Sequence, residues 1–281
     1  MKSWLILVIS VVGAFGPVRA VDILFFNQDC NLESPMMPDS SCGDERYNLS
    51  RILENLGHNL TILTDFHQAN LADLLAANDI FFIPDIEDQI HCNPMNLTFL
   101  PASAKTDISD YVEGGGRLIV SGSAQGVFLL NELFNLSLGH EGNTSMGLST
   151  KNEAQAIGTT YESCPSTIPN LDVTFLITSS MPPDKKCIYE SGGHTSLALF
   201  NVGAGEVAFL GFDFNDSGPG CTNDGTPWLS CGLESAISTF IPPPSPPSVP
   251  TLSQWSLYIL GLICLIVGTV SIRSTQVAPI Q

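Results

Sequence analysis

The chain has 281 residues and is strongly acidic, with 28 Asp and Glu against 10 Lys and Arg and a formal net charge of −18. An acidic surface repels phosphate groups, which excludes nucleic acid as a partner and disfavours adhesion to anionic lipid. It suits divalent cations or basic ligands.

The first 20 residues have the pattern of a secretory signal peptide. Lys2 precedes an apolar stretch from Trp4 to Phe15, and Ala20 provides a small residue at a cleavage point before Val21. We therefore expect an exported protein whose mature body spans residues 21–240. That length is sufficient for one substantial hydrophobic core.

Strand and helix patterns alternate through the first half of this body. Four short β-rich runs, each followed by an apolar stripe at helical spacing, are predicted at 21–26, 59–64, 80–84 and 117–120. Four consecutive β-α units predict a parallel sheet with helices on both faces. Further on, Ser196–Val202 and Glu206–Phe212 flank a glycine-rich turn and predict a hairpin, and Leu233–Phe240 predicts a closing helix. The predicted fold is a three-layer α/β/α sandwich with a mostly parallel sheet and an antiparallel extension at one edge.

Three segments of the body resemble the class I glutamine amidotransferase-like superfamily, which has a flavodoxin-like fold. They are Asp79–Pro84, the stretch Tyr111–Val120 with its Gly-Gly-Gly-Arg-Leu core, and Gly203–Asp213. The likeness is greatest to the branches that lack amidotransferase activity and occur in secreted and carbohydrate-associated proteins. The resemblance implies that the body is one exported domain of that fold.

Active members of that superfamily carry a cysteine nucleophile in a Gly-x-Cys-x-Gly turn after the strand that matches 117–120. This chain has Ala124 at the central position between Gly122 and Gly126. A shift of one residue offers Ser123 as a weak candidate nucleophile, which needs a base within hydrogen-bond reach. His140 and His194 follow it in sequence, neither in a triad-like context. The missing cysteine favours a non-catalytic domain.

Polar side chains follow the carboxyl ends of the predicted strands, where ligands bind in open parallel sheets. These residues are Asn27, Asp29, Asp65, Asp85, Glu87, Asp88, Ser121, Ser123, Asp213, Asn215 and Asp216. Neighbouring carboxylates repel one another unless a cation, a basic ligand or a proton relieves the repulsion. Calcium is the natural cation for such oxygen ligands, with Asp213, Asp216 and Asp224 as candidate ligands. The alternative is that these are ordinary solvated turn residues.

The eight cysteines lack any CxxC pair, which argues against a zinc site and favours disulfides. Loop length suggests Cys164 with Cys187 and Cys221 with Cys231. Cys30, Cys42 and Cys92 then compete for a third bond, and the sequence leaves the pairing open.

The C-terminal part predicts a proline-rich linker at 241–249 followed by a membrane-spanning helix at about 255–272. Residues 250–281 resemble the IPTL-type sorting signals that exosortase enzymes process in Gram-negative bacteria. The matching residues are Pro250, Thr251, Leu252, Ser253 and Trp255. The resemblance implies an exosortase-type partner and at least transient anchoring in the inner membrane. An ordinary single-pass anchor is the alternative.

Together these patterns predict a cell-surface or extracellular binding or structural module without catalytic activity, with polysaccharide or a cation as its possible ligand. Two alternatives stay open. One is a secreted hydrolase that uses Ser123 or the carboxylates at the sheet edge, and the other is a calcium-dependent component of an extracellular matrix.

Overall fold

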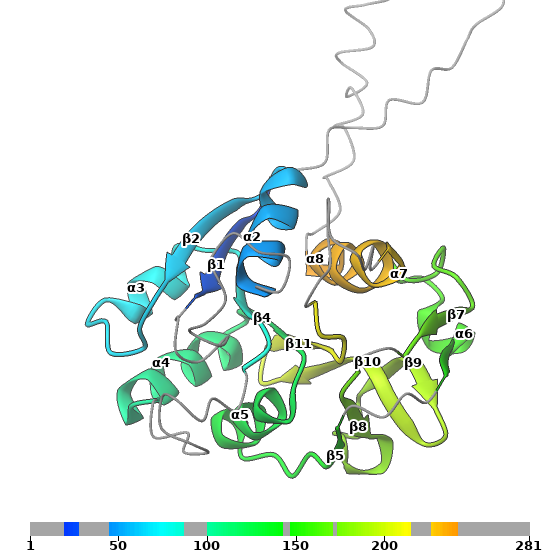
Figure 1. The fold of residues 1–281 in the computed structure, drawn as a ribbon. Helices are drawn as coiled ribbons and strands as arrows, with labels where there is room; N and C mark the ends of the chain where they lie inside the picture. Colours follow the sequence, from blue (N-terminus) through cyan, green and yellow to red (C-terminus); the bar gives the residue numbers. More distant parts are fainter. Residues whose placement is uncertain are drawn as a thin grey trace, which may run out of the picture. The chain divides into compact units, whose positions relative to one another are not determined.

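The computed structural model describes residues 20–27, 45–86, 100–142, 147–170, 173–214 and 226–240 (Figure 1). The predicted signal peptide, the linker and the sorting signal with its span lie outside these residues, apart from Ala20. Within the described residues, no helix combines the length and the apolar character that crossing a bilayer requires.

The sheet has a parallel half and an antiparallel half joined side by side. The parallel half has the order β2-β1-β3-β4-β11. Its strands are β1 (Asp22–Phe26), β2 (Asn59–Leu63), β3 (Ile80–Ile83), β4 (Arg117–Ser121) and β11 (Gly205–Leu210). The mixed α/β fold with parallel strands and the four predicted β-α units are thus confirmed.

The antiparallel half continues from β11 in the order β10-β9-β6-β7, and β8 pairs with both β10 and β5. These strands are β5 (His140–Glu141), β6 (Leu148–Lys151), β7 (Thr167–Pro169), β8 (Phe175–Ile177), β9 (Lys186–Ser191) and β10 (His194–Val202). The predicted hairpin is therefore β10–β11, and it lies in the middle of the sheet. The extension beyond it is larger than expected because β5 to β8 are two to four residues long and give no clear periodicity in sequence.

Helices connect the parallel strands and close the chain. They are α2 (Glu45–Asn55), α3 (Leu71–Ala76), α4 (Ala102–Glu113), α5 (Ala124–Phe134), α6 (Glu153–Ala156), α7 (Thr226–Trp228) and α8 (Ser235–Phe240). Two shorter turns are the 3₁₀ helix η2 (Thr178–Ser180) and the π-helix η3 (Leu229–Glu234). We call the continuous helical stretch Thr226–Phe240 the closing segment.

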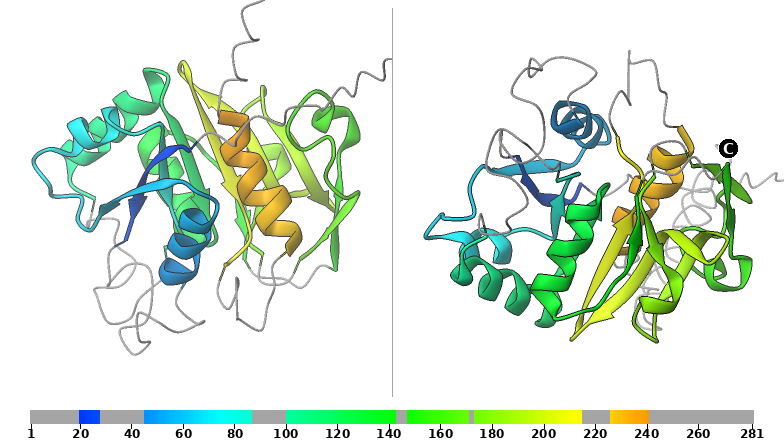
Figure 2. Two further views of the ribbon diagram at one scale, coloured as in Figure 1. Left: turned by 90° about the horizontal axis from the view of Figure 1, so that it is seen from above. Right: turned by 60° about the horizontal axis from the view of Figure 1, so that its bottom comes forward.

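Buried apolar side chains form two clusters, because successive strand residues point to opposite faces of a sheet. In β1, Ile23 and Phe25 belong to one cluster, and Leu24 and Phe26 to the other. The first cluster, the α2-side core, includes residues of α2 and the closing segment. The second, the α4-side core, includes residues of α3, α4 and α5. Figure 1 shows α2 and α8 on one side of the strands and α4 and α5 on the other, and Figure 2 shows the closing segment lying across the strands.

A disulfide joins Cys164 to Cys231, with 5.6 Å between their Cα atoms. Both predicted pairings that involve these residues are therefore wrong. Cys187 is buried as a free thiol in the α4-side core, whereas Cys164 lies in the α2-side core. The sheet separates the two residues, and proximity in sequence gave no sign of this. Cys221, the other predicted partner, lies outside the described residues.

Replacing both Cys164 and Cys231 by Ser should lower the free energy of unfolding by about 2–5 kcal/mol, because the bond restricts a long loop of the unfolded chain. Guanidinium unfolding followed by circular dichroism measures the change. Cys187→Ala is the matched control and should cost less, since it removes no cross-link. Non-reducing peptide mapping that linked Cys164 to Cys187 would contradict the observed pairing.

Candidate functional site

The carboxyl ends of β3, β4 and β11 meet at one edge of the sheet, and the chain places acidic residues there. Asp85 follows β3 by two residues and Asp213 follows β11 by three. Glu45 joins them from the first turn of α2. One carboxylate oxygen from each of these three residues lies within 4.8 Å of the other two. We call these three residues the acidic cluster.

The acidic cluster is partly enclosed by protein. Glu45 is 2% exposed and Asp85 is 6% exposed, whereas Asp213 is half-buried. Carboxyl groups are rarely buried to this degree unless they are paired or hydrogen-bonded. The burial distinguishes this cluster from solvated turn residues.

Hydrogen bonds hold two of the carboxylates in place. The Asp85 backbone N–H and the Ser121 hydroxyl both donate to Glu45 Oε1, each at 3.2 Å. The Ser123 backbone N–H donates to Asp85 Oδ1 at 2.9 Å. The last residue of β4 and the turn after it therefore each contribute a donor to one of the two buried carboxylates.

Gly122 lets this turn approach Asp85. Its φ of +76° lies in the left-handed region, and a Cβ atom built there would be 2.3 Å from Asp85 Cγ. A side chain at residue 122 would thus overlap the Asp85 carboxyl group. Glycine is required here both by conformation and by space.

The electrostatics of the site are dominated by Glu45. Burial, and then the negative charges of Asp85 and Asp213, raise the pKa of its carboxyl group well above the usual range. The hydrogen bonds from Asp85 and Ser121 act in the opposite direction but are weaker. Any bound cation would lower the energy of the ionised form of Glu45.

The atoms of the cluster that could bind a metal ion are all oxygens. Next to the carboxylates lies the Ser121 hydroxyl, which already contacts Glu45. Outside the cluster, at the carboxyl end of the neighbouring strand β1, Asn27 Oδ1 is buried, with no hydrogen-bond partner among the residues that the structure describes. Oxygen ligands of this kind suit hard divalent cations such as Ca²⁺ and Mg²⁺.

Of the three metal ligands predicted from sequence, Asp213 lies in the acidic cluster, whereas Asp216 and Asp224 lie outside the described residues. Four further residues predicted at the carboxyl ends of the strands also lie outside the described residues, namely Asp29, Glu87, Asp88 and Asn215. Asp65 does not join the cluster but contacts His67, with 2.8 Å between Asp65 Oδ1 and His67 Nδ1. The sequence analysis did not identify Glu45, because it precedes the apolar stripe of α2, whose first buried apolar residue is Leu49. The sequence feature that could have indicated Glu45 is an acidic residue in the first turn of a helix.

Ser123 is the N-cap residue of α5, and its Oγ donates to the Ile86 carbonyl at 2.6 Å. Its proton is therefore directed at a backbone oxygen and not at a base. His140 packs edge-on against Phe128, and His194 lies 3.3 Å from Glu141 in the antiparallel half. The structure gives no support to a Ser–His pair among these residues.

Comparison of the sequence with known protein families finds no match. Comparison with curated proteins finds none either.

Several solved structures are similar in fold. STM3548, described as a cytoplasmic protein of Salmonella typhimurium, covers 78% of this chain and 98% of its own length, with 11% identity and a TM-score of 0.52. STM1381, described as a cytoplasmic protein of Salmonella typhimurium LT2, covers 77% and 95%, with 16% identity and a TM-score of 0.50. A protein of Bacteroides uniformis named as ThuA-like covers 80% and 93%, with 13% identity and a TM-score of 0.51. At these identities the likeness concerns the fold alone.

These findings correct several sequence-based expectations. The resemblance to class I amidotransferases is replaced by a likeness to a ThuA-like protein, whose fold is related but distinct. The expected membrane anchor, with the membrane and an exosortase-type enzyme as its partners, finds no support in the structure, because no helix among the described residues could cross a bilayer. The expected export to the cell surface finds no support among the similar structures, two of which belong to proteins described as cytoplasmic.

The raised pKa of Glu45 predicts how stability depends on pH in a cation-free buffer. Between the unfolded-state pKa near 4.5 and the higher folded-state pKa, the folded protein binds more protons than the unfolded chain. This carboxyl group should therefore make the free energy of unfolding fall as pH rises through that window. Urea unfolding between pH 4.5 and 8 measures the trend.

Glu45→Gln should flatten this pH dependence, because the amide keeps an oxygen acceptor and removes the charge. Glu54→Gln, an exposed change on the same helix, should leave it unaltered. An unchanged slope in Glu45→Gln would assign the pH dependence to other groups.

Gly122→Ala should destabilise the protein more than Gly57→Ala does. Both glycines have a positive φ, but a Cβ atom at Gly57 meets nothing within 4 Å. Gly57→Ala should therefore cost only the conformational penalty of about 1–2 kcal/mol. Overlap with Asp85 should add about 1–3 kcal/mol for Gly122→Ala. Urea unfolding measures both losses. If Gly122→Ala and Gly57→Ala lowered the free energy of unfolding equally, the turn at Gly122 would not be in close contact with Asp85.

Proposed function

We propose that this protein is a non-catalytic binding domain whose ligand site lies at the carboxyl edge of the parallel half. In this proposal Glu45, Asp85 and Asp213 hold a divalent cation, and the cation forms the centre of the site. The convergence of three carboxylates from three separate segments of the chain is the observation that supports it.

The burial of the cluster adds a physical reason. Three carboxylates in this arrangement repel one another, and the repulsion is stronger where water is excluded. A divalent cation between the carboxylates offsets this repulsion. Ca²⁺ accepts irregular oxygen coordination and Mg²⁺ keeps several of its water ligands, so three carboxylates can serve either ion.

A hydrolase that uses Ser123 is less well supported. Ser123 occupies the N-cap position of α5, and its hydroxyl donates a hydrogen bond to the Ile86 carbonyl, which gives the residue a structural role. The likeness to other structures does not change this conclusion, because similar folds carry many unrelated functions.

The finer architecture is also a proposal. The two core clusters on opposite faces of the parallel strands support a three-layer α/β/α sandwich, with helices α2 and α8 in one outer layer and α3, α4 and α5 in the other.

Calcium and magnesium binding tests the proposed site. Isothermal titration of the cation-free protein should detect binding of at least one of the two ions, and the same ion should raise the thermal unfolding midpoint. Asp213→Asn should weaken the affinity by about tenfold or more, because it removes one charged ligand while keeping its shape.

Asp73→Asn is the matched control, since Asp73 is exposed on α3 and away from the cluster residues in sequence. It should leave the affinity unchanged. If neither ion binds, or if Asp213→Asn binds as tightly as the unaltered protein, the site does not hold the cation.

A further inference from the structure

Asp213 lies between two buried aromatic residues, Phe212 and Phe214. The ring of Phe214 meets the ring of Phe212 edge-on, with 5.0 Å between the centroids and an interplanar angle of 86°. Because both neighbours of Asp213 are fixed by their rings, the backbone that carries this carboxylate has little freedom to move.

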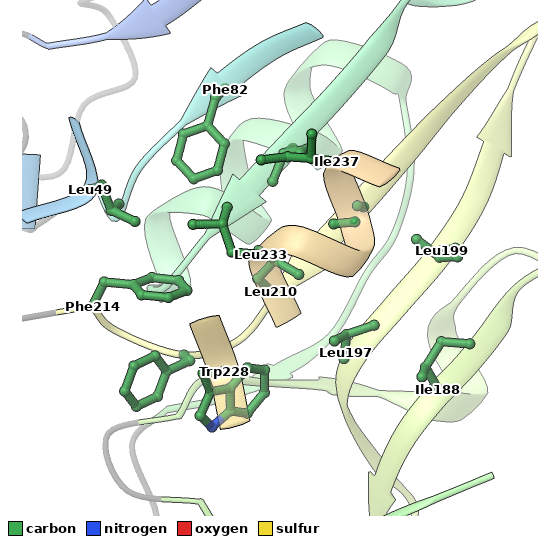
Figure 3. Close-up of a cluster of buried hydrophobic side chains, with 14 of the residues drawn as sticks. Leu49, Phe82, Ile188, Leu197, Leu199, Leu210, Phe214, Trp228, Leu233 and Ile237 are labelled. Carbon is green, nitrogen blue, oxygen red and sulfur yellow. The ribbon is translucent and has the colours of Figure 1, made fainter. Parts of the chain in front are cut away.

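Trp228 of the closing segment contacts Phe212 of this aromatic pair. Its ring stacks on Phe212 with a centroid distance of 5.3 Å and an interplanar angle of 6°. The indole Nε1 donates to the Pro169 carbonyl at 2.9 Å, which fixes the rotation of the ring. Trp228 is fully buried, and Figure 3 shows it in the α2-side core together with Phe214.

The other two carboxylates rest on the same core. Leu49, one turn after Glu45, and Phe82, three residues before Asp85, both belong to the α2-side core. Figure 3 shows Leu49 and Phe82 in one cluster with Phe214 and Trp228. The spacing of the acidic cluster is therefore set by how this core packs.

The closing segment is tied covalently to the rest of the fold near Trp228. Cys231 follows Trp228 by three residues and forms the disulfide with Cys164. The intervening turn is the π-helix η3, a conformation that is uncommon without tertiary support. The Thr160 hydroxyl adds a second tie, because it donates to the Ser235 carbonyl at 2.8 Å.

We propose that Trp228 is a positioning residue for Asp213, and that the Cys164–Cys231 disulfide keeps Trp228 in the place that cation binding requires. This inference rests on the proposed cation site. In it, the closing segment controls the affinity for the cation, although it contributes none of the three carboxylates. A change in the closing segment then alters affinity through the Phe212–Phe214 pair, without contact between Trp228 and the cation.

Calcium and magnesium titration of full-length variants tests this inference. Trp228→Leu should weaken the affinity for the binding ion by about tenfold, the range found for residues that orient metal ligands from outside. Trp228→Phe should restore most of the loss, because a phenyl ring still stacks on Phe212. The double change Cys164→Ser and Cys231→Ser should also weaken binding, by less than Trp228→Leu.

Phe200→Leu is the matched control, because it removes a buried ring from the α4-side core. It should lower the thermal midpoint and leave the affinity unchanged. If Trp228→Leu does not fold, Phe214→Leu takes its place, since it removes the ring that meets Phe212 edge-on and leaves Trp228.

The outcomes separate the two proposals. If the unaltered protein binds the ion and Trp228→Leu binds it equally well, the role of Trp228 is overturned and the cation site stands. An equal loss of affinity in Phe200→Leu would also overturn it, because the effect would then follow general destabilisation. If the unaltered protein binds neither ion, both proposals fail.

Discussion

Parallel pairing of β3, β4 and β11 is the constraint on which the site depends. Strands that run in the same direction deliver their following loops to the same edge of a sheet, however far apart they lie in sequence. Asp85 and Asp213 are therefore brought together by strand direction, and α2 adds Glu45 from the side. Antiparallel neighbours would have placed such loops at opposite edges.

Strand direction brings the carboxylates to one edge of the sheet, and the packing of the hydrophobic core fixes the distances between them. A close-packed interior permits few alternative arrangements of its side chains, so residues attached to it are held at fixed spacings. Each of the three segments that carry the carboxylates has a neighbouring side chain in the α2-side core. The repulsion within the cluster is thus opposed by apolar packing beneath it.

Much of the parallel half could be predicted from sequence, because runs such as Ile80–Ile83 and stripes such as that of α5 carry strong periodic signals. Asp85 and Asp213 could be predicted at the carboxyl ends of strands, but their meeting depends on the parallel pairing of β11 with β4, which the sequence did not predict. Glu45 could not be found in this way, since a residue in a loop-to-helix transition has no periodic signature. The Cys164–Cys231 bond also escaped prediction, because it depends on which face of the sheet each cysteine occupies.

The position of β11 makes the two halves of the sheet inseparable. It pairs in parallel with β4 and antiparallel with β10, so one strand belongs to both halves. A fragment ending after α5 would retain Glu45 and Asp85. It would leave the edge of β4 that pairs with β11 without hydrogen-bond partners and therefore exposed to self-association. A shortened form of the chain that keeps β4 paired on both sides must therefore include β11 as well.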